Sequence, residues 1–229
     1  MKSTTPIHEL TAAARAGLSG SWGKSIGVMI VYALLLTGVS HILFIGRILQ
    51  LVFMAPLIVG LNMWFLKTVR KQRNPFSLLF AGFDHFGTAW CAHMLVTLII
   101  LVWMIPFIVM GISAYFYVHP NPATFPGYTR IALYVLIGLL AAVVLVPLQM
   151  RYGLVLFVVA DEEPVRARQA LRQGVYLMKG NYGRLALLWL RFIGWQLLCI
   201  PTLGLGLFRL APYMSAATAA FYDDLVRNR

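Results

Sequence analysis

The chain has 229 residues, of which 60% are hydrophobic and only 11% are charged. A soluble globular domain is about 45–50% apolar and about 25% charged, so this composition excludes an ordinary water-soluble fold and predicts a protein that faces lipid. Nineteen lysines and arginines against seven acidic residues leave a formal charge of +12, which in such a chain indicates loops near anionic lipid and argues against nucleic-acid binding.

The first 25 residues predict a short helix at the membrane surface. Between residues 6 and 20 the apolar side chains recur at helical spacing, namely Ile7, Leu10, Ala14 and Leu18. The stretch GLSGSWGKS at residues 17–25 lacks the glycine spacing and the preceding strand of a phosphate-binding loop. We therefore interpret it as the entry to the first apolar span.

Six apolar segments are long enough to cross a membrane, since a spanning helix needs about 20 mostly apolar residues. They are residues 26–45, 48–66, 92–118, 131–160, 185–201 and 203–222. The fourth is long enough to tilt, to kink at Pro147 or to project from the membrane. The last two are joined only by Pro201 and Thr202, so a bent or re-entrant hairpin is an alternative to two full spans.

These segments predict an all-α polytopic transmembrane bundle that forms a single integral membrane domain over residues 1–229. Its expected parts are an interfacial helix at 1–25, spans at 26–66, a basic loop and interfacial helix at 67–91, spans at 92–160, a cytoplasmic helix at 161–184, spans at 185–222 and a tail at 223–229.

Basic residues flank the predicted spans asymmetrically. With the N-terminus inside, the inside segments hold fourteen lysines and arginines, and the two outside segments hold only Arg47 and Arg130. Since the side richer in Lys and Arg faces the cytoplasm, we expect a bacterial inner-membrane protein with both termini cytoplasmic.

Two segments between the spans are expected to lie on the cytoplasmic side. Residues 75–90 are rich in aromatic side chains and place on one side Phe76, Phe80, Phe83 and Phe86. Residues 164–179 predict a helix that begins at Pro164, since proline is tolerated at a first helical position. The acidic residues before it suit its N-terminal dipole, and they are Asp161, Glu162 and Glu163.

Three arginines fall inside the apolar segments, where a charge is costly; they are Arg151, Arg191 and Arg209. One interpretation is that their side chains snorkel toward water, with Gln149 beside Arg151 and Trp195 stacked on Arg191. The other is that the five residues line a polar cavity for an anionic ligand or a lipid headgroup.

Small residues in the last span predict a helix-packing face, against other helices or a sister subunit. The face consists of Ser215, Ala216, Ala219 and Ala220.

The residue types that bind metals do not have the spacing of a metal site; they are Asp84, His85, Cys91 and His93. We expect neither a metal, nor a cofactor, nor a catalytic centre.

Several motifs resemble those of one bacterial integral-membrane family. ADEEP, ARQALRQGVYLMKGNYGRL, RFIGWQLLCIPTLGLGLFRLAPY and SAATAAFYDDL, within residues 160–225, are similar to the C-terminal half of the family known as domain of unknown function number 975. SGSWGKS and LLFAGF in the N-terminal half fit the same family more loosely. The resemblance implies a multi-span bundle, with no assigned activity and no catalytic residues.

Two functions are compatible with these features. The first is a non-enzymatic membrane protein that self-associates and interacts with anionic lipid or with a membrane partner. The alternative is a carrier or channel for an anionic or lipid-like solute, with Arg151, Arg191 and Arg209 along its path.

Overall fold

The computed structural model of the chain describes residues 5–40, 43–119, 126–161, 166–199 and 204–228. These residues form helices and no strand, which confirms the all-α expectation for this part of the chain. The helices are α1 (Ile7–Leu18), α2 (Trp22–Ser40), α3 (Leu43–Val69), α4 (Leu78–Ala81), α5 (Phe86–Val118), α6 (Gly127–Tyr152), α7 (Val155–Asp161), α8 (Ala167–Met178), α9 (Tyr182–Cys199) and α10 (Leu207–Arg227).

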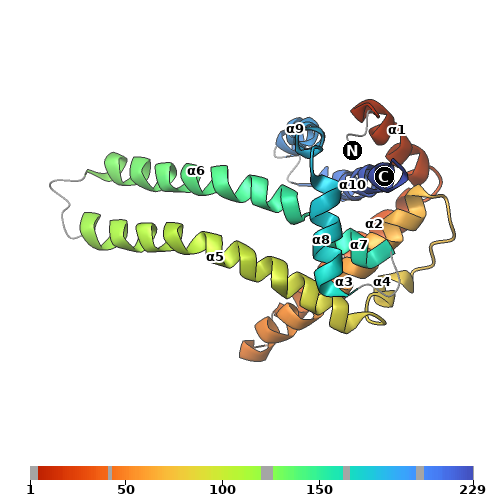
Figure 1. Cartoon of the computed structure of the whole chain (residues 1–229), viewed down its shortest axis with the longest axis horizontal. Helices are drawn as coiled ribbons and strands as arrows, with labels where there is room; N and C mark the ends of the chain where they lie inside the picture. The colour runs from red at the N-terminus through yellow and green to blue at the C-terminus, as the bar shows by residue number, and fades with distance from the viewer. Residues whose placement is uncertain (1–4, 41–42, 120–125, 162–165, 200–203, 229) are drawn as a thin grey trace.

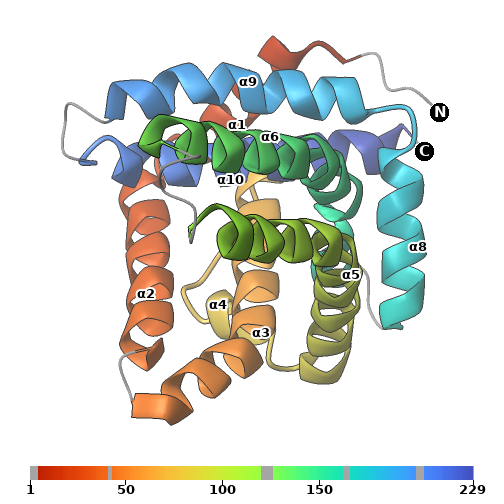
Figure 2. The same ribbon diagram turned by 90° about the vertical axis from the view of Figure 1, so that its left-hand side faces the viewer.

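Two helical hairpins extend from a group of helices that we call the head. The head consists of α1, α4 and α7–α10, packed around the C-terminal half of α3. The α5–α6 hairpin projects from the head to the left in Figure 1, and both chain ends lie within the head. The α2–α3 hairpin leaves the head in another direction, downward in Figure 2.

Among the described residues, three helical stretches are long and apolar enough to cross a membrane: Leu49–Val69, Phe86–Val118 and Gly127–Asp161. A fourth is added if α1 and α2, which meet at 92°, are counted as one broken span. Several membrane-crossing helices are therefore available, as the sequence predicts. The six predicted spans are not all among them: residues 26–45 fall largely on α2, which counts only together with α1, and residues 185–201 and 203–222 correspond to α9 and α10.

The composition of α9 and α10 explains this difference. Arg184, Arg191 and Gln196 interrupt α9, and α10 carries Arg209 near its start and two aspartates near its end. Figure 1 shows α9 end-on while α5 and α6 lie lengthwise, so α9 runs across the direction of the long hairpin. In Figure 2, α9 and α10 run beside each other along one edge of the head. The turn predicted at residues 201–202 lies outside the described residues.

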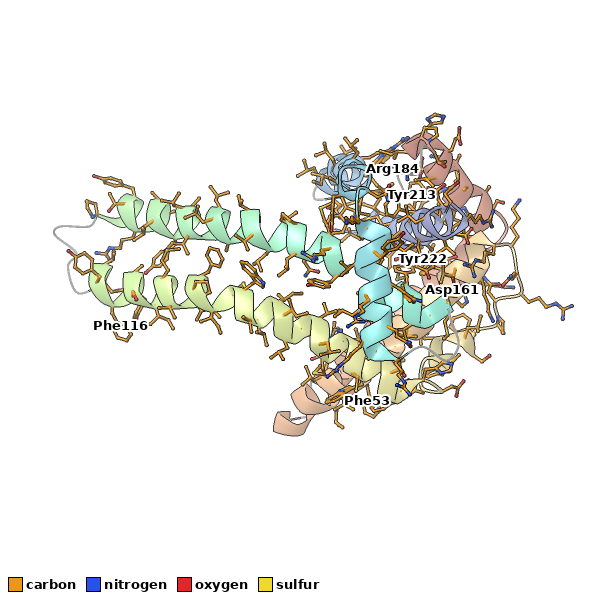
Figure 3. The ribbon with its side chains drawn as sticks, viewed as in Figure 1. Phe53, Phe116, Asp161, Arg184, Tyr213 and Tyr222 are labelled. Atoms are coloured by element: carbon orange, nitrogen blue, oxygen red, sulfur yellow. The ribbon has the colours of Figure 1, made fainter. Side chains whose placement is uncertain are left out.

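The α5–α6 hairpin buries little of its apolar surface within the chain. Its 33-residue helix α5 is about 50 Å long at 1.5 Å per residue. In the most apolar part of each stretch, 0% of the residues are buried in Phe86–Val118 and 6% in Gly127–Asp161. The corresponding value for the α3 stretch is 56%. Figure 3 shows apolar side chains such as Phe116 projecting from it on both sides. Such a surface needs lipid or another protein to cover it.

The long fourth apolar segment divides into two helices. Pro147 remains inside α6, and the break comes later, at Gly153. The short helix α7 that follows is packed into the head, and it buries Val155, Phe157 and Val158. The end of this segment therefore belongs to the head, while α6 belongs to the exposed hairpin.

Helix α1 forms where the periodicity predicts a helix, but its apolar face packs against α10 and α3. Leu10, Ala14 and Leu18 are all buried. Tyr213 of α10 donates a hydrogen bond to the Thr11 carbonyl at 3.4 Å. The stripe that suggests a membrane-surface helix is thus covered by protein.

Helix α8 occupies the predicted cytoplasmic segment, and it begins at Ala167 rather than at Pro164. Glu162, Glu163 and Pro164 lie outside the described residues. The helix is amphipathic, with Arg168 and Arg172 exposed on one side. Its other side packs on α7.

The aromatic segment after α3 contains the four-residue helix α4 and a row of rings. Phe80 and Phe83 have ring centroids 6.5 Å apart, as do Phe83 and Phe86. Phe53 of α3 lies 5.9 Å from Phe83. These contacts place the segment against the α2–α3 hairpin.

Candidate functional site

The head contains a cluster of arginines and aspartates that come from distant parts of the chain. Its members are Arg70, Asp161, Arg184, Asp223, Asp224 and Arg227, and we call them the ion-pair cluster. Each lies at or near the end of a helix, so the cluster gathers the inner ends of α3, α7, α9 and α10. Asp161 and Arg184 are labelled in Figure 3.

Arg70 forms the centre of the ion-pair cluster. Its two terminal nitrogens donate hydrogen bonds to both carboxylate oxygens of Asp161, and its Nε donates to Asp223 at 2.8 Å. The Arg70 side chain is 24% exposed, and the two aspartates are 13% and 10% exposed. A bidentate pair shielded from water to this degree is stronger than a surface ion pair.

The end of α3 sets the position of Arg70. Lys71 adopts a positive φ of 54°, and Gln72 donates its backbone N–H to the Lys67 carbonyl at 2.9 Å. Lys71 also donates to the Thr68 carbonyl at 3.1 Å. This pair of bonds is a Schellman motif, which ends a helix and satisfies its last carbonyls.

Hydrogen bonding stabilises the charged form of Arg70. The hydrogen bond to Asp161 is the largest cause, and together with the bond to Asp223 it raises the pKa of Arg70 even though burial acts in the opposite direction. The guanidinium therefore stays charged wherever the protein is folded, and the ion-pair cluster holds a permanent cation.

The second part of the ion-pair cluster ties the start of the chain to its end. Arg184 donates to Asp224 Oδ2 at 3.0 Å and to the Thr5 carbonyl at 2.6 Å. The Thr5 hydroxyl in turn donates to Asp224 Oδ1 at 2.6 Å. Arg184 also lies over the Phe221 ring, 5.6 Å from its centroid.

Sequence reasoning treats Arg70 and Arg184 only as two of many cytoplasmic charges. A signal for their pairing exists, because carboxylates are scarce and five of the seven stand at the ends of apolar segments. A carboxylate in such a position needs a basic partner. The pattern does not say which of the many basic residues supplies it.

Most other basic side chains of the head, and of the first turn of α2 beside it, are exposed. We call the following residues the basic surface: Arg15, Lys24, Lys71, Arg73, Arg166, Arg168, Arg172 and Lys179. Asp161, Asp223 and Asp224 pair inside the ion-pair cluster, so these three carboxylates do not offset the basic surface.

The predicted polar cavity residues lie on three different helices. Arg151 is exposed in the last turn of α6, with its guanidinium 5.8 Å from the Tyr152 ring centroid. Arg209 of α10 lies over Trp22 at 5.2 Å. Arg191 is exposed on α9. Arg151 and Arg209 thus contact different rings.

One groove does include a predicted residue. It has a volume of about 340 Å³ and is lined by Trp103, Val144, Pro147, Leu148, Arg151 and Tyr182. We call it the Arg151 groove. Two further residues predicted to line the polar cavity, Gln149 and Trp195, are exposed. Neither lines the Arg151 groove.

The predicted small-residue face is covered inside the chain. Ala216, Ala219 and Ala220 are buried and Ser215 is half-buried. Helix α10 packs against α1 and α3, so its small side chains allow close contact between helices of the head.

Within the described ranges, no group of three or more His, Cys, Asp or Glu side chains is placed to hold a metal ion. Asp84 and Cys91 are exposed, and His85 and His93 are half-buried. The Cys199 thiol is buried and donates to the Trp195 carbonyl at 3.2 Å.

Comparison with known proteins adds one finding. A family model described as a protein of unknown function (DUF975) matches residues 1–229. No curated protein matches the chain, and no solved structure matches it.

Proposed function

We propose that this chain, which belongs to the DUF975 family of proteins of unknown function, is a non-enzymatic integral membrane protein. Its charge distribution indicates that it holds anionic lipid against the basic surface of its head. One observation carries this proposal: Asp161, Asp223 and Asp224 are paired internally with Arg70, Arg184 and Arg227. The eight residues of the basic surface take no part in these pairs and are exposed, so they are the ones available to anionic lipid.

The proposed arrangement in the membrane has four spans: α2, α3, α5 and α6 with α7. It places the tips of both hairpins on one side and the head, with both chain ends, on the other, so the two hairpins, which leave the head in different directions (Figures 1 and 2), cross the membrane with different tilts. Arg47 and Arg130 then lie on the side of the hairpin tips, and the basic surface lies on the opposite side. By the positive-inside rule the head is cytoplasmic in a bacterial inner membrane. Both four and six spans keep the two termini on the same side.

In this arrangement α9 lies in the membrane interface. One face of α9 is buried on the head through Leu185, Leu188 and Phe192. The remainder exposes apolar side chains, namely Leu187, Leu190, Ile193, Trp195, Leu197 and Leu198. Such a helix packs one face on protein and exposes apolar side chains and a tryptophan on the other. This combination suits the boundary between lipid headgroups and acyl chains.

A cysteine-labelling experiment distinguishes four spans from six. In a background of Cys91→Ser and Cys199→Ala, Leu205→Cys and Tyr128→Cys introduce thiols at positions that are 70% and 74% exposed. We expect a membrane-impermeant maleimide to label Y128C from outside intact cells. It should reach L205C only after the membrane is permeabilised, because the α9–α10 turn is cytoplasmic. Labelling of both from outside would support six spans.

A lipid-enrichment experiment tests the function itself. Arg168→Gln, Arg172→Gln and Lys179→Gln together remove three charges from the basic surface. Each basic residue near an anionic surface contributes about 1 kcal/mol, so we expect a clear fall in the ratio of phosphatidylglycerol to phosphatidylcholine retained after mild detergent extraction. Gln169→Ala on the same helix is the matched neutral control. An unchanged lipid ratio in the triple variant would contradict the proposal.

We place self-association on the α5–α6 hairpin, because the small-residue face of α10 is occupied by α1 and α3. The hairpin presents two long apolar helices that the rest of the chain leaves uncovered. Stoichiometry measured by native mass spectrometry tests this placement, and Val143→Arg on the hairpin should shift a discrete oligomer to monomer.

The carrier alternative remains a prediction, since Arg151 lines a groove whereas Arg209 lies over Trp22.

A further inference from the structure

We propose that the Arg151 groove binds a single anionic phospholipid, with its phosphate at the Arg151 guanidinium and its acyl chains along the α5–α6 hairpin. This inference deepens the proposed function, on which it rests, by naming one site and one ligand class. It concerns a discrete bound lipid, whereas the basic surface acts on many lipids at once.

The lining of the Arg151 groove calls for an anionic occupant. Three elements contribute to it: Trp103 from α5, four residues from α6 and Tyr182 from the start of α9. Arg151 is the only charged residue among these, and the others are apolar or aromatic. The carboxylates of Asp161, Asp223 and Asp224 are engaged elsewhere, in the ion-pair cluster. An arginine is the side chain best shaped to hold a phosphate through paired hydrogen bonds.

The position of the Arg151 groove matches the depth of lipid headgroups. Arg151 is in the last turn of α6, immediately before the break at Gly153 that leads into the buried helix α7. The groove therefore lies where the exposed hairpin meets the head. Tyr182 and Trp103 are amphipathic side chains of the kind found at this level of the bilayer.

The groove opens toward a lipid-covered surface, which favours a lipid over a free anion. Trp103 is 52% exposed, and Leu140 and Val143 extend the apolar surface along α6. A volume of about 340 Å³ is near the lower limit of small-molecule sites, which run to about 1,000 Å³. It suits a phosphate headgroup, and the acyl chains then lie outside it, against the hairpin.

The test uses the full chain reconstituted in nanodiscs with equal amounts of phosphatidylglycerol and phosphatidylcholine, followed by native mass spectrometry. We expect the wild type to retain one phosphatidylglycerol per chain. Arg151→Gln removes the charge, and Leu148→Trp fills the groove but keeps Arg151. Each should reduce retention of that lipid by about tenfold or more, the usual effect of losing a hydrogen bond to a charged group or access to its site.

Arg191→Gln is the matched control, because Arg191 is an exposed arginine of α9 outside both the groove and the basic surface. It should retain the lipid as the wild type does. Thermal unfolding monitored by circular dichroism verifies that the variants fold, and Arg151→Lys should recover part of the retention. Loss of the lipid to the same degree in R191Q, or unchanged retention in R151Q and L148W, would overturn the proposal. Displacement by millimolar inorganic phosphate would also overturn it, because the groove would then select a free anion.

The outcomes separate this inference from the proposed function. If the triple variant of the basic surface loses bulk phosphatidylglycerol but R151Q loses nothing, the function stands and the groove is not a site. If one Arg151-dependent lipid remains without any bulk preference for anionic lipid, the proposed function fails and the groove is a site.

Discussion

Replacing Arg70 with methionine is expected to lower the free energy of unfolding by about 3–5 kcal/mol, the usual effect of removing one partner from a buried ion pair. The methionine keeps much of the stem of the side chain but leaves Asp161 and Asp223 facing each other without the guanidinium between them. For a chain of this size the loss corresponds to a fall in melting temperature of roughly 6–20 °C. Circular dichroism of the detergent-solubilised protein during heating measures it.

Arg227→Met is the matched control for Arg70. Arg227 also pairs with Asp223, at 2.8 Å, but its side chain is 70% exposed. An exposed pair of this kind contributes at most about 1 kcal/mol. Equal destabilisation by R70M and R227M would show that burial and bidentate geometry do not distinguish the two arginines.

The pH dependence of this pair has a defined direction. The hydrogen bond to Asp161, and then that to Asp223, raise the pKa of Arg70 above its ordinary value. A raised pKa in the folded state adds stability that is present at all pH values below the ordinary pKa and is lost only as the pH rises beyond the folded value. We therefore expect the difference between wild type and R70M to persist unchanged from about pH 7 to about pH 10.

Gly60→Ala and Gly82→Ala are expected to separate α4 from α3. A Cβ atom on Gly60 would stand 2.0 Å from the Leu79 carbonyl oxygen, and one on Gly82 would stand 2.0 Å from the Pro56 carbonyl oxygen. Both clashes are with backbone, which cannot rotate away as a side chain can. Overpacking typically costs about 1–3 kcal/mol, and here it also threatens the burial of Leu78 and Leu79.

Glycines on the exposed hairpin provide the control for Gly60 and Gly82. A Cβ added at Gly111 or Gly138 meets nothing within 4 Å, and alanine is the better helix former by about 1 kcal/mol. G111A and G138A should therefore leave the melting temperature unchanged or raise it. If G60A melts like G138A, the close approach of α4 to α3 is not required for the fold.

Local pattern alone determined a large part of this protein. Composition and apolar length predict an all-α chain that faces lipid. The second, third and fourth apolar segments fall within the membrane-crossing stretches of α3, α5 and α6 with α7 or overlap them, and the first overlaps α2. Helical spacing also places a helix where α1 and α8 occur. These features depend on residues within a few turns of one another, and such neighbours are what hydrophobic periodicity reports.

The arrangement of α9 and α10 was decided by tertiary structure. Their apolar content is close to that of a span, but Arg184 and Asp224 are paired in the head, and Leu188 and Phe192 are buried there. An amphipathic helix of marginal hydropathy satisfies the same pattern whether it crosses a membrane or packs on other helices. The partner that covers its apolar face makes the difference.

The ion-pair cluster and the Arg151 groove likewise depend on contacts that no local pattern contains. Arg70 is 91 residues from Asp161 and 153 residues from Asp223 along the chain, and the Arg151 groove joins α5, α6 and the start of α9. The sequence by itself determined that arginines stand at the ends of apolar segments. Only the packing of the helices decided which arginines meet a carboxylate and which remain available, because a charge pairs with the group that folding brings within hydrogen-bond distance.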